Sequence, residues 1–209
     1  MKKYHIDLHV HTGRYSQCAE ALDPYLLDRA ARESALDGLV ITEHDAIWTD
    51  EEIAELRMRF GKNLKIYRGV EVSSSDGHFV VIGMQKTDKI SVGISLAELF
   101  SIAAEYDAAI ILVHPHRSDS GRRIIEKYPN WSSYLHAVEV ASTYTHGGEE
   151  KSAARHLATL ADLAMVAGSD AHCLDNVGIY STEFDFLPED EAALAAAIKS
   201  RAGSPYRHS

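Results

Sequence analysis

HIDLHVHT, residues 5–12, alternates polar and apolar side chains near the amino terminus. Successive side chains of a β-strand point to opposite faces, so His9 and His11 share one face and apolar side chains occupy the other. The segment therefore predicts a strand whose apolar face packs against helices. Imidazoles two residues apart at a strand end can reach one cation, but a polar exposed strand face is an equally good interpretation of this pair alone.

Short apolar runs rich in β-branched residues alternate with longer stretches of helical period along the rest of the chain, as is typical of parallel strands covered by helices. Strands are predicted at 4–9, 38–42, 64–71, 78–83, 109–114, 137–140 and 164–168. Helices are predicted at 23–35, 50–60, 95–106, 149–161 and 189–200. No linker, repeat or low-complexity tract divides the chain. Residues 1–209 are therefore expected to form one α/β domain, a barrel of seven strands.

The composition is that of an ordinary globular domain, with 45% hydrophobic and 25% charged residues. The formal net charge of −10 opposes a polyphosphate strand, so a nucleic-acid polymer is not expected as a partner. Cys18 and Cys173 lie far apart and form no C-x-x-C pair, which favours free thiols in a reducing cytoplasm. No apolar run is long enough for a membrane span or a signal peptide. We expect a cytoplasmic protein without a membrane partner.

Imidazole and carboxylate side chains gather at the ends of the predicted strands. The set comprises His9, His11, Glu43, His44, Glu71, His78, His114, Asp170 and His172. For any one of them alone, a satisfied structural residue is the commoner interpretation. Together they need shared partners, and a cation can serve several buried ionisable groups at once. Because the connecting loops of a barrel emerge at the carboxyl ends of its strands, we expect the chemistry there.

Five motifs occur in order along the chain: DLHVHT at 7–12, TEHD at 42–45, RGVE at 68–71, HPH at 114–116 and GSDAH at 168–172. With them the chain resembles the polymerase and histidinol phosphatase (PHP) family, in its metal-dependent phosphoesterase branch. The resemblance implies a distorted seven-stranded (β/α)7 barrel whose cleft holds two or three divalent ions. It implies a first metal bound by His9, His11, Glu71 and Asp170. Glu71 would bridge to a second metal held by His78 and His114, and a third would be held by His44 and His172.

Two departures from the family pattern concern the third metal. Glu43 stands where family members usually carry Asp, and the segment 13–18 offers no imidazole or carboxylate where many members have a further ligand. We therefore expect a third ion to be weakly held. Binding through Cys18 and complete absence of that ion are the alternatives. Zn, Mn and Fe all suit imidazole with carboxylate, so the metal's identity stays open.

Three residues are predicted to take part in catalysis: His116, Arg117 and Asp170. Arginine grips phosphate oxygens bidentately, and Arg117 directly follows the HPH motif. His116 could hydrogen-bond the phosphate or protonate the leaving group, or face outward in a structural role. A hydroxide bridging two ions would be the nucleophile that the resemblance implies. The expected enzyme is a metal-dependent phosphoric ester hydrolase that acts on a small phosphomonoester.

Two other functions remain open. A metal-activated hydroxide can also attack carbon, so an amidohydrolase-type reaction on a C–N bond is one alternative. A non-catalytic PHP module that binds a protein partner is the other. Glu139 is predicted to face inward without an assigned role, and His136, His146, His156 and His208 are predicted to be ordinary residues. The loop at 118–133 is expected to carry the choice of substrate.

Overall fold

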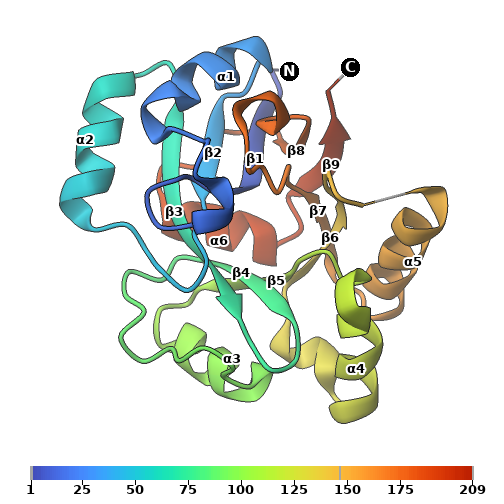
Figure 1. Cartoon of the computed structure of the whole chain (residues 1–209). Coiled ribbons are helices and arrows are strands. Elements are labelled where there is room, and N and C mark those ends of the chain that lie inside the picture. The colour runs from blue at the N-terminus through green and yellow to red at the C-terminus, as the bar shows by residue number, and fades with distance from the viewer. Residues whose placement is uncertain (1, 146, 209) are drawn as a thin grey trace.

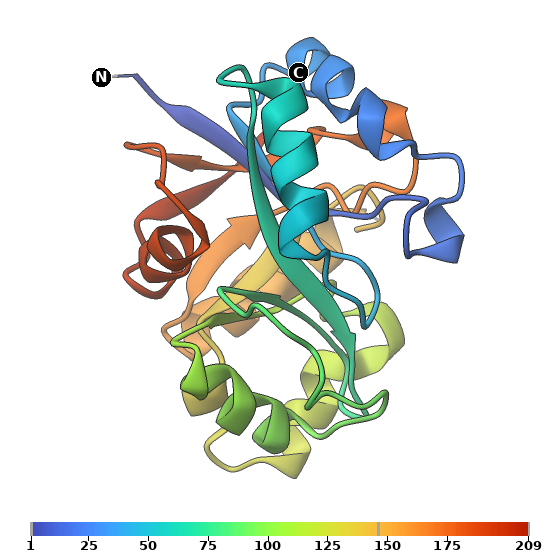
Figure 2. The same cartoon turned by 90° about the vertical axis from the view of Figure 1, so that its left-hand side faces the viewer.

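The computed structural model describes residues 2–145 and 147–208. Within them one sheet contains nine strands in the order β7-β6-β5-β4-β3-β2-β1-β8-β9. The strands are β1 (Tyr4–Val10), β2 (Gly38–Ile41), β3 (Lys65–Ser73), β4 (His78–Ile82), β5 (Ala109–Leu112), β6 (Ala137–Ala141), β7 (Ala164–Ala167), β8 (Tyr180–Phe184) and β9 (Gly203–Arg207). Figure 2 shows β3, the longest strand, running through both halves of the molecule.

Helices surround the sheet (Figure 1). They are α1 (Leu27–Glu33), α2 (Asp50–Phe60), α3 (Leu96–Glu105), α4 (Ser120–Lys127), α5 (Gly147–Leu160) and α6 (Glu191–Lys199). The helices α2 and α3 each begin with a capping box, formed by Thr49 with Glu52 and by Ser95 with Glu98. Among the described residues no helix is both long and apolar enough to cross a membrane.

All seven predicted strands are present, but the seven-stranded alternating barrel is not confirmed. The strand β4 runs antiparallel to both β3 and β5, because a short turn joins β3 directly to β4 and leaves no room for the crossover that a parallel pair needs. The strands β8 and β9 extend the sheet antiparallel beyond β1. The sequence of β8, YSTEF, is more than half polar, and that of β9, GSPYR, carries Gly and Pro, so both give weak strand signals. Helix α4 was also missed.

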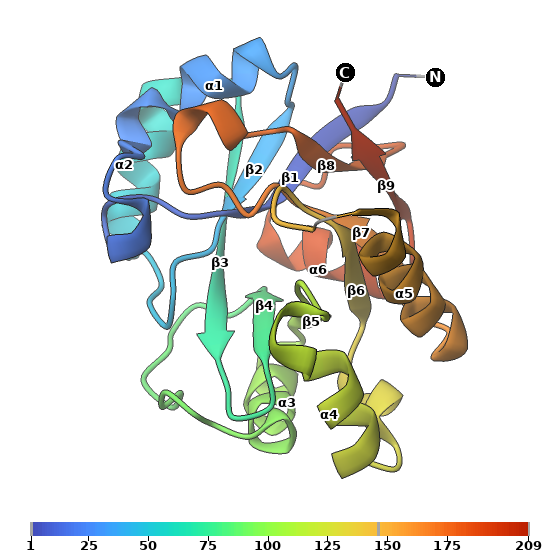
Figure 3. The same cartoon turned by 45° about the vertical axis from the view of Figure 1, so that its right-hand side comes forward.

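The sheet curls until the segment after β7 meets β1, which nearly closes a barrel. Val10 and Ala171 pair as an isolated parallel bridge, and the backbone N–H of His11 donates to the carbonyl oxygen of Ala171 at 3.0 Å. Thr182 on β8 accepts from the N–H of Ala167 at 3.0 Å. Figure 3 shows β8 and β9 lying beside β1 and β7. The carboxyl ends of β1 and β7 are thereby brought together.

Apolar side chains fill the interior of the sheet at one end. Leu194 and Ile198 of α6 join Ile6, Leu8 and strand residues such as Val80 in one buried cluster, so α6 closes that end. Two further clusters lie outside the sheet, one beneath α1 and α2 and the other beneath α3 and α5. The polar strand ends lie beyond the interior cluster, where a site can form. The prediction that residues 1–209 form a single domain stays a prediction.

Candidate metal centre

Strand β1 and the residue that directly follows it supply two imidazoles to a buried cluster. His9 and His11 have their Nε2 atoms 3.1 Å apart. These atoms lie 3.2 and 3.0 Å from Oε2 of Glu71, and 3.4 and 3.3 Å from Oδ1 of Asp170. All four side chains are buried, and their ligand-type atoms lie within 4.8 Å of one another. The sequence predicted this set as the first metal site, and the structure brings it together.

Glu71 lies between the two predicted principal sites. Its Oε1 atom is 2.8 Å from Nδ1 of His78 and 3.0 Å from Nε2 of His114. Its Oε2 atom faces His9 and His11 and is also 3.2 Å from Nδ1 of His44. The two oxygens of one fully buried carboxylate therefore face different sets of imidazoles, which is the arrangement expected of a bridging ligand.

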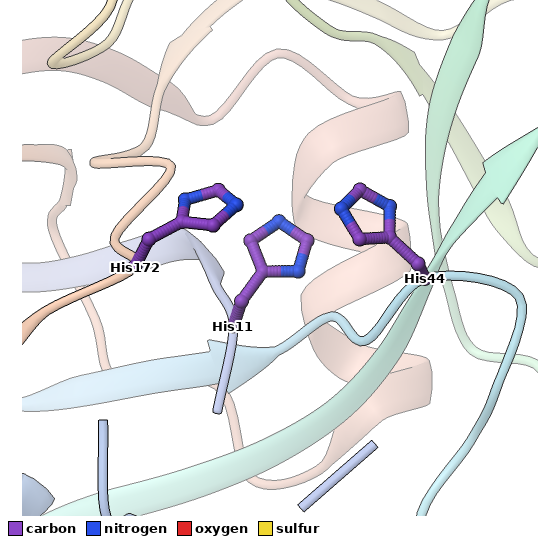
Figure 4. A group of neighbouring side chains, drawn as sticks. All are labelled: His11, His44 and His172. Carbon is purple, nitrogen blue, oxygen red and sulfur yellow. The ribbon is translucent and has the colours of Figure 1, made fainter. Parts of the chain in front are cut away.

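Figure 4 shows the imidazole of His11 between those of His44 and His172. The ring centroids are 4.4 Å apart for His11 and His44, and 4.5 Å apart for His11 and His172. These three residues form a further group of possible ligands. The sequence predicted His44 and His172 here, and the structure adds His11. Cys18 is a free, exposed thiol and belongs to none of the groups found among the described residues.

Asp170 carries the observation that best tests whether a cation fits. Both of its carboxylate oxygens are buried and have no hydrogen-bond partner within residues 2–145 and 147–208. Its backbone is left-handed, with φ of 54°, a costly conformation for a residue other than glycine. Buried carboxylate oxygens that accept no hydrogen bond are unfavourable unless nearby positive charge, such as a bound cation, compensates them. Together with the imidazoles of His9 and His11, the Asp170 carboxylate makes a donor set that suits Zn, Mn or Fe.

The charges within the cluster shift its titration. Burial lowers the pKa of His9, but the nearby carboxylates of Asp170 and Glu71 outweigh burial and raise that pKa well above its ordinary value. Burial raises the pKa of Glu71, but His9 and the other imidazoles outweigh it and hold this pKa well below its ordinary value. The pKa of Asp170 is lowered against burial by the same imidazoles. Both carboxylates therefore stay charged, as metal ligands must.

At the edge of the cluster, burial outweighs the effect of the nearby carboxylates on the imidazole pKa values. It lowers the pKa of His44 and of His172, with nearby imidazoles adding to the effect. Neutral imidazoles are the form that ligates a metal. These two residues are therefore held ready for ligation at neutral pH.

Glu139 supports the cluster from β6 and was not assigned this role from the sequence. Its Oε1 atom is 3.0 Å from Nδ1 of His9, and its Oε2 atom accepts from the backbone N–H of His114 at 3.2 Å. The prediction that Glu139 faces inward is confirmed. An acid between valines in a short strand was the available signal, but its partner lies in a distant part of the chain.

A second buried carboxylate holds the loop after β1. Glu43 accepts hydrogen bonds from the hydroxyl and backbone N–H of Thr12, from Oγ of Ser16 at 2.5 Å and from Nε1 of Trp48 at 2.9 Å. Ser16 Oγ lies 3.3 Å from Nδ1 of His11. Glu43 is therefore connected to the cluster by a chain of contacts through Ser16 to His11. The sequence singled out neither Ser16 nor Trp48.

The other acids near the motifs bind backbone groups. Asp45, next to His44, accepts from the N–H of Ser73 at 2.7 Å. Asp7 accepts from the N–H groups of His9, Ser169 and Gly178 at 3.2, 2.8 and 2.9 Å. Asp7 thus accepts hydrogen bonds inside the barrel and connects β1 to both ends of the loop 169–178.

Two cavities adjoin the cluster, and Arg117 and His114 line both. The first, of about 190 Å³, is also lined by His116, Glu139, Tyr144 and Glu150, and we call it the Glu150 cavity. The second, of about 170 Å³, is also lined by Arg123, and we call it the Arg123 cavity. Nη1 of Arg117 lies 3.7 Å from Oδ2 of Asp170, so this predicted catalytic residue reaches the cluster. His116 lies in a cavity wall, outside the donor groups.

Three histidines predicted to be ordinary, His136, His156 and His208, lie apart from these donor groups. His136 accepts from the N–H of Ile110 at 3.0 Å, and His208 bonds Oγ of Ser181 at 2.9 Å. His156 lines a groove between α4 and α5. His146 lies outside the described residues.

Comparison with known proteins agrees with the motifs. A family model described as PHP-associated matches residues 148–202, from α5 through α6. A protein of Methanocaldococcus jannaschii, described as uncharacterized, is 32% identical over 124 residues, which are 57% of this chain and 51% of that protein. The matched region thus spans about half the length of this curated relative.

Solved structures share the fold over nearly the whole chain. PsfC from Pseudomonas syringae matches with a TM-score of 0.70 and 18% identity, covering 100% of this chain and 93% of that one. An amidohydrolase from Chromobacterium violaceum has a TM-score of 0.64 and 19% identity, covering 97% of each chain. A Bifidobacterium adolescentis protein assigned as a metal-dependent phosphoesterase has a TM-score of 0.59 and 16% identity, covering 94% of this chain and 96% of that one.

One further match bears on the predicted partners. A lesion-specific endonuclease from Pyrococcus furiosus has a TM-score of 0.64 and 14% identity, covering 99% of this chain and 58% of that one. Endonuclease Q also matches in complex with a duplex substrate that carries an abasic lesion. The same fold therefore occurs in an enzyme that acts on DNA. The prediction, made from net charge, that this chain has no nucleic-acid polymer as a partner is not supported.

Proposed function

We propose that this chain, a member of the polymerase and histidinol phosphatase family, is a metal-dependent hydrolase that cleaves a small phosphomonoester. The observation that carries the proposal is the position of Glu71. One oxygen of its buried carboxylate faces His78 and His114, and the other faces His9 and His11. Such a carboxylate can join two neighbouring cations, the arrangement that suits phosphoester hydrolysis.

The proposed ligands follow the contacts of the Glu71 and Asp170 carboxylates. His9, His11, Glu71 and Asp170 would hold one divalent ion, and Glu71, His78 and His114 a second. His44 and His172 would hold a third ion more weakly, because His11 already faces Glu71 and Asp170. When bound, the ions supply an activated water and neutralise negative charge on the phosphate.

Residues of the chain complete the proposed site. The Arg117 guanidinium, near Asp170 and 47% exposed, can turn toward the substrate and bind phosphate oxygens. The Nε2 atom of His116 is buried without a hydrogen-bond partner among the described residues, in the wall of the Glu150 cavity. A phosphate oxygen held at the edge of that cavity would meet His116 as a donor of a hydrogen bond.

Metal removal and restoration test the proposal. Protein treated with chelator should lose release of phosphate from a panel of phosphomonoesters, and regain it with Mn, Zn or Fe. His114→Ala should lower both metal content and turnover. His156→Ala is the matched control, since His156 lies on the outer groove, and it should change neither. Turnover that survives complete stripping would reject a metal-dependent reaction.

Hydrolysis of a C–N bond is the second candidate. The structural match to an amidohydrolase favours it. Amide and cyclic-amide substrates are offered to the metal-loaded protein beside the phosphomonoesters. Cleavage of the amides would indicate the second reaction, whereas release of inorganic phosphate from the esters would indicate the first. A non-catalytic module would have no need of this donor set, and a metal-loaded protein that binds a partner without turning over any substrate would favour that function.

A further inference from the structure

The two cavities beside the cluster differ in charge. The Glu150 cavity has two carboxylates in its lining, from Glu139 and Glu150. The Arg123 cavity is lined by Ser74, Ser75, Gly77, His78, His114, Arg117, Ser120 and Arg123. This lining contains two guanidinium groups and no carboxylate. An anionic group next to the cluster would therefore be favoured in the Arg123 cavity.

Arg123 differs from its neighbour on α4. Arg122 pairs with Asp119 and Glu126, at 3.5 and 3.8 Å. Within the described part of the chain Arg123 has no ion pair, although its side chain lines a cavity beside two proposed metal ligands. An exposed guanidinium without a carboxylate partner can bind an incoming anion without first breaking an ion pair.

The walls of the Arg123 cavity are fixed in place. Gly77, in the turn between β3 and β4, has φ of +150°, and a Cβ there would lie 2.7 Å from Cβ of Ser120. The turn is held from within, because Oγ of Ser74 accepts from the N–H groups of Asp76 and Gly77. Helix α4 begins at Ser120, so the positive end of its dipole lies at the same cavity. The turn and the helix thus make one preformed pocket.

We propose that the substrate carries a second anionic group, a carboxylate or another phosphate, and that this group binds in the Arg123 cavity. The proposal rests on the proposed phosphoesterase function. The scissile phosphate would lie at the cluster with Arg117, and the second anion would lie beside it, against Arg123. Arg123 is then a residue that determines specificity, and the substrate class is a small phosphomonoester with two separated anionic groups.

Matched pairs of esters test this specificity. Phosphoglycolate is compared with ethyl phosphate, and ethanediol bisphosphate with hydroxyethyl phosphate, so that carboxylate and phosphate are tested separately. The wild-type enzyme should favour the ester with the second anion by roughly 10- to 100-fold in kcat/KM, as a charge-assisted contact provides. Arg123→Gln should lower that ester's kcat/KM by the same factor and bring the preference toward unity. Arg122→Gln, the control, should change neither member of a pair.

Equilibrium binding separates failure of this inference from failure of the proposed function. Calorimetry on the metal-loaded protein should show that Arg123→Gln weakens the binding of ethanediol bisphosphate by roughly 10-fold or more. The binding of hydroxyethyl phosphate should weaken much less. This difference in binding is expected even if the protein hydrolyses no ester. A lack of hydrolysis would overturn only the phosphoesterase assignment. Equal binding of both ligands by the wild type overturns the inference, as does an equal loss for both in the variant. Preferential cleavage of a short DNA oligonucleotide would also overturn it.

Discussion

The Nδ1 atom of His9 on β1 lies 3.0 Å from Oε1 of Glu139 on β6, although 130 residues separate the two in the chain. Both side chains are buried. When the N–H at Nδ1 donates a hydrogen bond to this carboxylate, Nε2 carries the lone pair. That lone pair points toward Glu71 and can bind a cation. The tautomer of a proposed metal ligand is thus set by a residue that belongs to none of the donor groups.

Glu139→Gln is expected to weaken divalent-cation binding by about 10- to 100-fold. The amide is uncharged, and its NH₂ group would face either His9 or the backbone N–H of His114, which now donates to Oε2 at 3.2 Å. Competition with a chromogenic chelator measures the affinity, and a thermal melt of the metal-free protein checks the fold. An unchanged affinity would mean that His9 is oriented without Glu139.

Glu71→Gln is expected to reduce metal content at both principal positions. One carboxylate faces all the flanking imidazoles, and an amide gives one neutral oxygen in place of two charged ones. The loss of affinity should exceed the roughly 10²-fold typical of residues that only orient ligands. Elemental analysis after dialysis measures the ions that remain. A variant that still retains the wild-type number of ions would contradict the bridging role.

Gly168→Ala is expected to destabilise the fold and the cluster together. A Cβ at this position would lie 2.6 Å from Cβ and 2.8 Å from the backbone N of His9, so the segment after β7 must move away from β1. Overpacking of this kind costs about 1–3 kcal/mol of unfolding free energy. Melting temperature and metal content should both fall.

Gly148→Ala is the matched control for that substitution. A Cβ at Gly148, in the first turn of α5, meets nothing within 4 Å. Its effect on the unfolding free energy should stay within about 1 kcal/mol, toward greater stability. Equal melting temperatures for both variants would show that the contact between Gly168 and His9 is not tight.

Asp7 predicts a pH dependence of stability. Burial raises the pKa of Asp7 from 3.8 to about 6, although N–H groups of Ser169 and Gly178 oppose the rise. Because the folded pKa lies above the unfolded value, the stabilising contribution is present below about pH 4 and is lost as the pH rises through about 6. Between these limits the wild type should lose about 3 kcal/mol relative to Asp7→Asn.

Denaturant unfolding of both metal-free proteins, measured from acidic to neutral pH, checks that difference. The imidazoles and the other carboxylates titrate in both proteins, so their effects cancel in the comparison. Parallel pH curves for the wild type and Asp7→Asn would show that Asp7 titrates normally despite its burial.

The local patterns in the sequence predicted much of the architecture. Seven strands were placed because each is a short β-branched run, and α2 and α3 because apolar residues recur there with helical spacing; the structure adds a capping box at the start of each helix. The strands β8 and β9 were not predicted, because their stability comes from pairing with β1 and with each other. A polar segment of five residues does not reveal such pairing. The antiparallel direction of β4 likewise depends on a turn too short for a helix.

The sequence by itself determined which side chains could ligate a metal, because imidazole and carboxylate groups at strand ends carry their chemistry wherever the chain places them. Only the tertiary structure decided which of them meet. It put both oxygens of Glu71 among five imidazoles, placed Glu139 behind His9 and left Arg123 facing a cavity without a carboxylate. The reason is that sheet order and curl set distances between residues far apart in the chain, and no local pattern encodes those distances.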